Sequence, residues 1–189
     1  MSSSARFENM NDLFTESVRR YASRPLFGTK VRGEWRWMSY SEFGKQVEAA
    51  RAGLAKQGIG KGDVVAVISN NRPEWAVGAY ASYGLGASYV PMYEEQHDTE
   101  WRFILDDCAA KVVLVANEKV RDAVLGIASQ LPKLLRVVVM SGDGKGELAI
   151  SWEQLLKDGE RRDVPILKIE DPKHIAGFIY TSGTTGNPK

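Results

Sequence analysis

The stretch DVVAVIS, residues 63–69, contains an apolar run with no polar interruption between Val64 and Ile68. Two later segments have the same character, KVVLVA at 111–116 and LRVVVM at 135–140. Short runs of this kind are typical of strands that are buried on both faces of a parallel sheet. Parallel strands need long crossover connections, which are usually helices. The three runs therefore predict an α/β fold with a layered, mostly parallel sheet and flanking helices.

Segments with helical spacing alternate with these strands. Apolar residues recur at intervals of three or four, which predicts helices over 10–22, 73–86, 98–108, 118–130 and 151–157. Further strands are expected at 88–92 and 175–181, the second running directly into a polar, glycine-containing loop. Strands that alternate with helices in this order indicate one layered α/β unit.

Local signals place several of the turns and helix ends. Ser39 and Glu42 have the Ser-x-x-Glu spacing of a capping box, which predicts that a helix begins after Ser39. Gly58 suits the end of that helix, and Pro73 suits the first turn of the next one. Before them, 26–31 and 34–38 are expected to pair as a hairpin. Side chains alternate along a strand, so Trp35 and Trp37 share one face of the hairpin, where we expect them to pack.

Composition excludes several classes of protein. The 189 residues include 25 Lys or Arg and 24 Asp or Glu, so the formal net charge is only +1. This balance argues against a nucleic-acid-binding domain, which usually carries a clustered basic excess. The single cysteine excludes an internal disulfide. No apolar run is long enough to cross a bilayer, and the polar residues 1–11 do not resemble a secretory signal. We therefore expect a cytoplasmic protein, with peripheral membrane attachment as an addition.

The last nine residues, TSGTTGNPK at 181–189, carry the chemistry. Gly183 and Gly186 allow backbone N–H groups to turn toward a bound anion, and Lys189 adds a positive charge. Hydroxyl groups that can donate to phosphate oxygens come from Thr181, Ser182, Thr184 and Thr185. The spacing is not that of a Walker A loop, because the two glycines are only three positions apart. A polar surface turn is the alternative for a shorter stretch of this composition.

Residues 178–189 resemble the signature of the adenylate-forming (AMP-binding) superfamily, which includes acyl-CoA synthetases, luciferases and the adenylation domains of peptide synthetases. The segment MSYSEF at 38–43 is similar to the first core motif of that superfamily, and YGLGASYVPM at 83–92 is similar to the second. Within the superfamily, NNRPEWA at 70–76 and VPMYEE at 90–95 look most like long-chain fatty acyl-CoA synthetases. The resemblance covers the whole chain.

The resemblance implies an ATP-dependent ligase. In such enzymes a carboxylate, here a long-chain fatty acid, attacks the α-phosphate of Mg-ATP, and coenzyme A then displaces AMP from the acyl-adenylate. By analogy, Thr184 lies near Mg²⁺ and Lys189 neutralises charge on the leaving pyrophosphate. The residues implied in phosphate binding are Thr181, Ser182, Gly183, Thr184, Thr185, Gly186 and Lys189. The expected partners are these small molecules, without nucleic acid.

The resemblance also implies that residues 1–189 form only the amino-terminal part of the AMP-binding domain, truncated at the phosphate-binding loop. The later motifs of the family, including those that contact adenine and ribose and the catalytic lysine, have no counterpart here. We therefore expect this chain alone to be inactive, and to expose an apolar face through which it can self-associate. Two alternatives stay open: a short non-catalytic module that binds nucleotide or a partner, and a structural fragment without a ligand.

The remaining reactive residues have simpler interpretations. His97 and His174 have no second ligand at metal-binding spacing. Cys108 lies on the apolar side of a predicted helix, so a buried thiol is favoured over a nucleophile. Three aromatic residues at helical spacing are interpreted as core rather than as the lining of an acyl tunnel, namely Trp75, Tyr80 and Tyr83.

Overall fold

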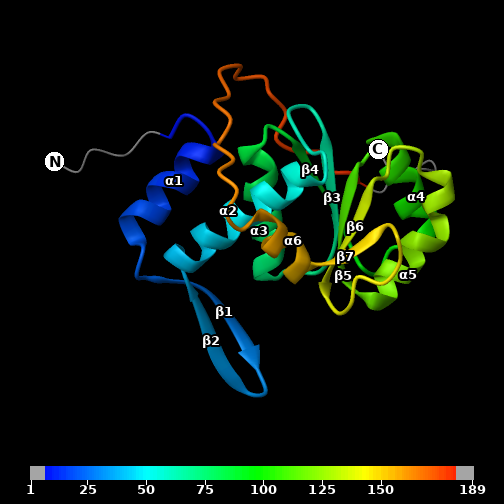
Figure 1. The fold of residues 1–189 in the computed structure, drawn as a ribbon, viewed down its shortest axis with the longest axis horizontal. Coiled ribbons are helices and arrows are strands. Elements are labelled where there is room, and N and C mark those ends of the chain that lie inside the picture. Colours follow the sequence, from blue (N-terminus) through cyan, green and yellow to red (C-terminus); the bar gives the residue numbers. More distant parts are fainter. Residues whose placement is uncertain (1–6, 182–189) are drawn as a thin grey trace.

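The structure, a computed structural model, describes residues 7–181 and has a layered α/β architecture (Figure 1). A parallel sheet of five strands lies at its centre, in the order β4-β3-β5-β6-β7. The strands are β3 Val64–Ile68, β4 Ser88–Met92, β5 Val112–Asn117, β6 Arg136–Ser141 and β7 Ala149–Ser151. The α/β fold with a parallel sheet that the apolar runs predicted is thus confirmed.

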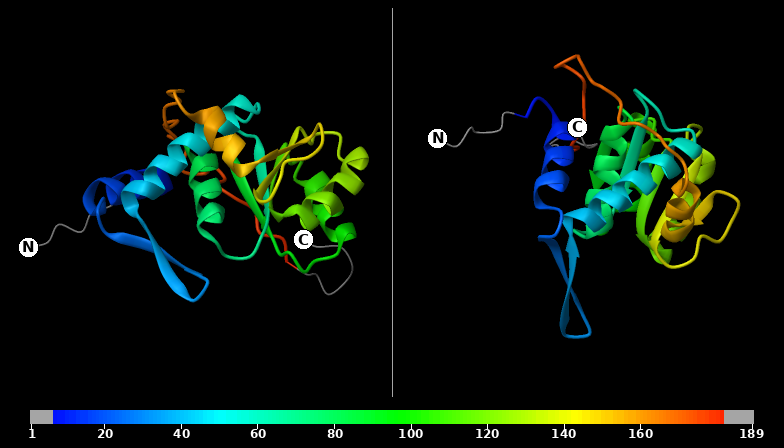
Figure 2. Two further views of the ribbon diagram at one scale, coloured as in Figure 1. Left: turned by 60° about the horizontal axis from the view of Figure 1, so that its bottom comes forward. Right: turned by 60° about the vertical axis from the view of Figure 1, so that its left-hand side comes forward.

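Helices cover both faces of this sheet (Figure 2). One face packs against α2 Tyr40–Lys56, α3 Pro73–Gly84 and α6 Trp152–Gly159. The other face packs against α4 Asp98–Asp107 and α5 Glu118–Ile127, which is followed by the 3₁₀ turn η1 Ala128–Gln130. The amino-terminal helix, α1 Met10–Tyr21, lies on the outside of α2 and α3.

Strand β3 shows why the sheet needs both layers. All five of its residues are buried. Val65 and Val67 belong to the apolar cluster on the α2–α3 side, whereas Val64, Ala66 and Ile68 belong to the cluster on the α4–α5 side. Successive side chains of a strand point to opposite faces, so an uninterrupted apolar run is stable only between two apolar layers.

The predicted local signals are confirmed. The Ser39 hydroxyl accepts the Glu42 N–H at 3.2 Å, and the Glu42 carboxylate accepts the Ser39 N–H at 2.7 Å, which completes the capping box of α2. Gly58 follows that helix with φ +87°, the left-handed conformation that favours glycine. Pro73 occupies the first turn of α3.

The hairpin consists of β1 Pro25–Val31 and β2 Glu34–Ser39, paired antiparallel around a turn at Arg32 and Gly33. Trp35 and Trp37 share a face, and their ring centres lie 5.9 Å apart. The prediction that they share a face and pack on the hairpin is confirmed, although both side chains are largely exposed, at 60% and 61%. The two rings stack on each other instead of joining either core cluster.

The prediction of a strand at 175–181 is wrong. This segment forms a single parallel bridge with β4, between Gly177 and Tyr89, in which the Tyr89 N–H donates to the Ala176 carbonyl at 2.9 Å. The next β4 residue that would donate toward this edge is Pro91, which has no N–H. The ladder therefore stops after one bridge, although the pattern of 175–181 is that of a strand.

Strand β7 was not predicted, since only three residues form it after a glycine-rich loop. It leads into α6, which packs closely on α2. At Gly53 of α2, an added Cβ would lie 2.3 Å from the Leu155 carbonyl oxygen, and at Gly159 of α6 it would lie 1.9 Å from the Ala49 carbonyl oxygen. These two glycines allow the helix backbones to approach each other.

We predict that Gly53→Ala destabilises the protein by about 1–3 kcal/mol, because the backbone atoms that it would meet belong to a packed helix and cannot move aside. Gly126 is the matched control: it also lies within a helix, and nothing lies within 4 Å of an added Cβ. Gly126→Ala should be neutral or stabilising by up to about 1 kcal/mol. Urea unfolding measures both values, and equal effects would contradict the close approach.

Candidate functional site

The carboxyl ends of the strands form the candidate site. The chain leaves β3 toward α3 on one face of the sheet, and it leaves the neighbouring strand β5 toward α5 on the other face. In open α/β sheets, ligands bind outside the carboxyl ends of the strands where the connections diverge in this way. The ends of β3 and β5 are such a switch point.

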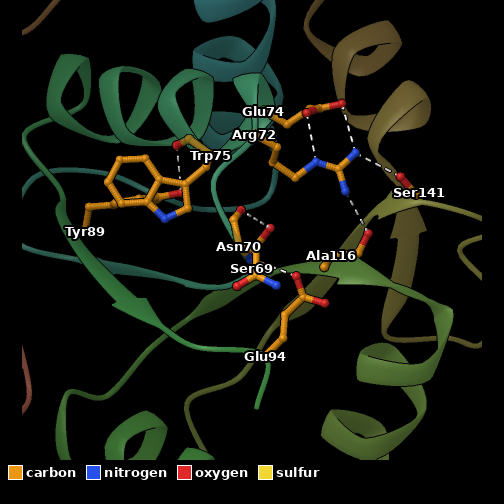
Figure 3. Close-up of polar contacts among 9 residues, drawn as sticks. All are labelled: Ser69, Asn70, Arg72, Glu74, Trp75, Tyr89, Glu94, Ala116 and Ser141. Carbon is orange, nitrogen blue, oxygen red and sulfur yellow. Dashed lines mark hydrogen bonds and ion pairs between the residues drawn. The ribbon is translucent and has the colours of Figure 1, made fainter. Parts of the chain in front are cut away.

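Glu94, which follows β4, holds the loops at the switch point together. Its carboxylate accepts the Asn70 N–H at 2.8 Å (Figure 3). It also accepts a hydrogen bond from the Asn117 side-chain amide at 3.2 Å. Asn70 follows β3, and Asn117 ends β5. The Asn117 side-chain oxygen also accepts the Val120 N–H at 3.1 Å and so caps α5. One carboxylate therefore links the ends of three strands.

Arg72 fills the adjoining space between α3 and the sheet (Figure 3). Its guanidinium donates to both oxygens of Glu74, at 2.9 and 3.1 Å. It also donates to the Ala116 carbonyl at 3.1 Å and to the Ser141 hydroxyl at 2.8 Å, at the ends of β5 and β6. Since four of its hydrogen bonds are made within the chain, Arg72 supports the site and is not a free phosphate-binding cation.

The environment of Glu74 reflects this pairing. Burial raises the pKa of the Glu74 carboxyl, but hydrogen bonds from Arg72 and a backbone amide, with the charge of Arg72, outweigh burial and leave it below its ordinary value. The ionised Glu74 carboxylate therefore stabilises the fold at pH values above its ordinary pKa. This contribution is lost as the pH falls through the lowered pKa of the folded protein. The sequence analysis did not predict Arg72 and Glu94 as site residues. The signal that could have identified them is their position shortly after the strands predicted at 63–69 and 88–92.

A pocket opens beside this network. It has a volume of about 360 Å³ and is lined by Glu94, Glu95, Trp101, Asn117, Lys119, Val120 and Ala123. The Trp101 indole N–H donates to the Tyr93 carbonyl at 3.0 Å, which fixes the ring at the wall. The pocket thus combines an aromatic wall with carboxylate, amide and ammonium groups at its rim.

The segment that leads to the predicted phosphate-binding residues is docked on the edge of β4. The Ser88 hydroxyl donates to the Ile175 carbonyl at 2.8 Å, and the Tyr180 hydroxyl donates to the Asp107 carboxylate at 2.5 Å. Thr181 is exposed and is the last residue described. The other predicted site residues lie outside the described residues, namely Ser182, Gly183, Thr184, Thr185, Gly186 and Lys189. Their roles stay predictions.

The residues given simpler interpretations have ordinary surroundings. The Cys108 thiol lies 3.8 Å from the Leu105 carbonyl, and burial raises its pKa to about 11. Trp75, Tyr80 and Tyr83 pack against the core, and the Tyr89 hydroxyl donates to the Trp75 carbonyl at 3.0 Å (Figure 3). Within residues 7–181, no three His, Cys, Asp or Glu side chains are grouped to hold a metal ion. No helix in this range is long and apolar enough to span a membrane.

The described residues form a doubly wound sheet with a switch point, and a hydroxyl- and glycine-rich sequence follows at 181–189. This is the class of α/β fold in which nucleotides commonly bind at the carboxyl ends of the strands. The chain belongs to the family of AMP-binding enzymes, whose family model matches residues 14–189. This confirms the resemblance seen in its sequence motifs.

Named relatives agree with this assignment. The chain is 29% identical to the peroxisomal long chain acyl-CoA synthetase 7 of Arabidopsis thaliana and to the long-chain-fatty-acid–CoA ligase ACSBG1 of Homo sapiens. These matches cover 95% and 94% of this chain but only 27% and 25% of the relatives. The adenylation domain of a carboxylate reductase from Mycobacterium chelonae has the same fold, with a TM-score of 0.82, 21% identity, and coverage of 100% of this chain and 34% of that chain.

We predict that Arg72→Met destabilises the protein by about 2 kcal/mol near neutral pH, because the Glu74 carboxylate then stays partly buried without its partner. Without Arg72, burial would raise the pKa of Glu74 above its ordinary value. The loss should therefore be smaller at about pH 4, where the carboxyl is protonated. Adding Glu74→Gln to Arg72→Met should remove this pH dependence in urea unfolding; its persistence would point to another group.

We also predict that Cys108 is chemically inert in the folded chain. A pKa of about 11, against an ordinary value of 9.0, lowers the thiolate fraction near pH 8. Alkylation by iodoacetamide should then be about 100-fold slower than in urea-unfolded protein. Equal rates in the two states, followed by mass spectrometry, would show an accessible and activated thiol instead.

Proposed function

We propose that the chain is the amino-terminal part of the adenylation domain of an AMP-forming acid–thiol ligase. The reaction activates a carboxylic acid with ATP as an acyl-adenylate and transfers the acyl group to coenzyme A. The observation that carries the proposal is the match of the family model through the whole loop 181–189, which continues from the segment docked on β4. One relative is named as a long chain acyl-CoA synthetase and the other as a long-chain-fatty-acid–CoA ligase, which supports a long-chain fatty acid as the substrate class.

The residues of the loop would act on the phosphates of ATP. Backbone N–H groups and hydroxyls from 181–186 would hold the β- and γ-phosphates, and Lys189 would offset the negative charge that develops on the leaving pyrophosphate. A Thr184 hydroxyl is a hard oxygen donor of the kind that Mg²⁺ accepts, and a bound Mg²⁺ would neutralise further phosphate charge. The described residues contribute the rigid support: the bridge at Tyr89 and the Tyr180–Asp107 bond orient the chain as it enters the loop.

The outer edge of β4 supports the proposal that more of a domain packs there. Ile175, Phe178 and Ile179 are 53%, 37% and 77% exposed along the segment beside this edge. Exposed apolar side chains that lie together are typical of a surface that another part of a protein covers. On this proposal the chain by itself is inactive, and it self-associates through this edge. The proposed location of the protein is the cytoplasm.

The first experiment reads the coding sequence beyond Lys189. The proposal expects an open frame that encodes the later motifs of the family. The encoded protein should then catalyse exchange between ATP and pyrophosphate that depends on a long-chain fatty acid. A stop codon after Lys189 in the native gene, with saturable binding of Mg-ATP by this chain, would instead support a non-catalytic nucleotide-binding module.

In that encoded protein, we predict that Lys189→Ala lowers kcat for the exchange by about 10²–10³-fold, since it removes a charge that acts on the transition state. The control is Lys173→Ala, because Lys173 is an exposed cation outside the loop. It should leave kcat unchanged. Equal activity of the two variants would contradict the role of Lys189.

A further inference from the structure

The hairpin of β1 and β2 presents an exposed aromatic surface that the proposed reaction does not use. It projects away from the helices and the sheet in every view (Figures 1 and 2). Trp35 and Trp37 stack on its surface, and an added Cβ at Gly28 would lie 2.9 Å from the Trp37 ring. The Trp37 ring therefore packs directly over Gly28. The two stacked indoles form an exposed apolar patch, called the tryptophan plate below.

The hairpin that carries this plate is basic, with Lys30 on the face of the plate and Arg36 on the opposite face. Residues 24–38 contain four cations, Arg24, Lys30, Arg32 and Arg36, against one anion, Glu34, so this segment has a charge of +3 in a chain whose total is +1. All four cations are exposed. Within residues 7–181, none of them is in a salt bridge. Lys30 stands directly opposite Trp35 in the register, which places it on the same face as the plate.

We propose that this hairpin docks onto the surface of an anionic lipid bilayer. Indole rings favour the headgroup region of a membrane, where an apolar ring and its N–H both find partners. Lys30 and Arg32 would meet anionic headgroups beside the rings, each contributing attraction that salt screens. The turn at Arg32 and Gly33 is polar, which restricts the contact to the headgroup region and excludes insertion into the hydrocarbon core.

Charge decides between this occupant and a second copy of the chain. A two-fold contact between two hairpins would bring the same cations against each other, which is unfavourable. An anionic surface would instead attract the same cations. The proposal concerns only the hairpin and is independent of the proposed ligase reaction, because its test measures membrane binding.

The test is co-sedimentation of the 189-residue chain with vesicles of phosphatidylcholine alone and of phosphatidylcholine with about one third phosphatidylglycerol. Binding is expected only with the anionic vesicles and should weaken as salt rises. Trp35→Ser with Trp37→Ser should reduce partitioning at least about tenfold, which corresponds to about 60 Å² of apolar surface returned to water. Tyr93→Ser is the matched control, because Tyr93 is 72% exposed but lies at the end of β4, and it should bind like wild type.

A second pair of variants keeps the tryptophans. Lys30→Gln with Arg32→Asn should weaken binding about fivefold for each cation removed. Asn is chosen at position 32 because Arg32 has φ +51°, which Asn tolerates. These changes replace exposed side chains, and circular dichroism with the urea midpoint verifies that all the variants fold.

Three results would overturn the proposal. The first is no binding of wild type to anionic vesicles. The second is binding that neither pair of variants changes, or that Tyr93→Ser reduces equally. The third is a wild-type dimer, seen by sedimentation, that the tryptophan variant dissociates while no vesicle binding occurs; the plate would then join two copies of the chain.

Discussion

Burial of β3 from both sides is the constraint on which the other elements depend. Its five residues are all buried, and they contribute alternately to the two apolar clusters. A central strand of this kind is stable only if the chain supplies a helix layer for each face. The connections after β3 and β5 must then leave the sheet in opposite directions. The switch point at their carboxyl ends is a direct consequence of covering both faces.

A switch point leaves polar loop ends close together, and this protein pairs them internally. Arg72 bonds to Glu74, Ala116 and Ser141, while Glu94 bonds to Asn70 and Asn117. These contacts tie the ends of β3, β4, β5 and β6 into one rigid edge. Because the groups at this edge satisfy one another, the proposed contacts to phosphate come from residues 181–189 instead. The edge acts as the support.

Pro91 shapes the other side of the sheet. It ends the ladder that Tyr89 begins with Gly177, so the segment before the loop lies along β4 with exposed apolar side chains instead of forming a sixth paired strand. The chain spans about a quarter of the length of its curated relatives. The exposed edge beside β4 and the exposed tryptophan plate on the β1–β2 hairpin are two different surfaces. The first is apolar and flanks the sheet, and the second is aromatic, basic and separate from the core.

The sequence by itself determined the elements that depend on neighbouring residues. Uninterrupted apolar runs identified β3, β5 and β6, the Ser39–Glu42 spacing identified the start of α2, and the composition of 181–189 indicated an anion-binding loop that the family match supports. Tertiary structure alone decided what depends on contacts between distant residues. Arg72 and Ser141 are 69 positions apart, and neither sequence neighbourhood indicates the bond. Residues 175–181 have a strand pattern but lack a complete ladder, because a proline in β4 removes the donor. Trp35 and Trp37 alternate as predicted, yet they stay exposed because no element of the described structure packs over that face, and periodicity indicates which side chains share a face without indicating what covers it.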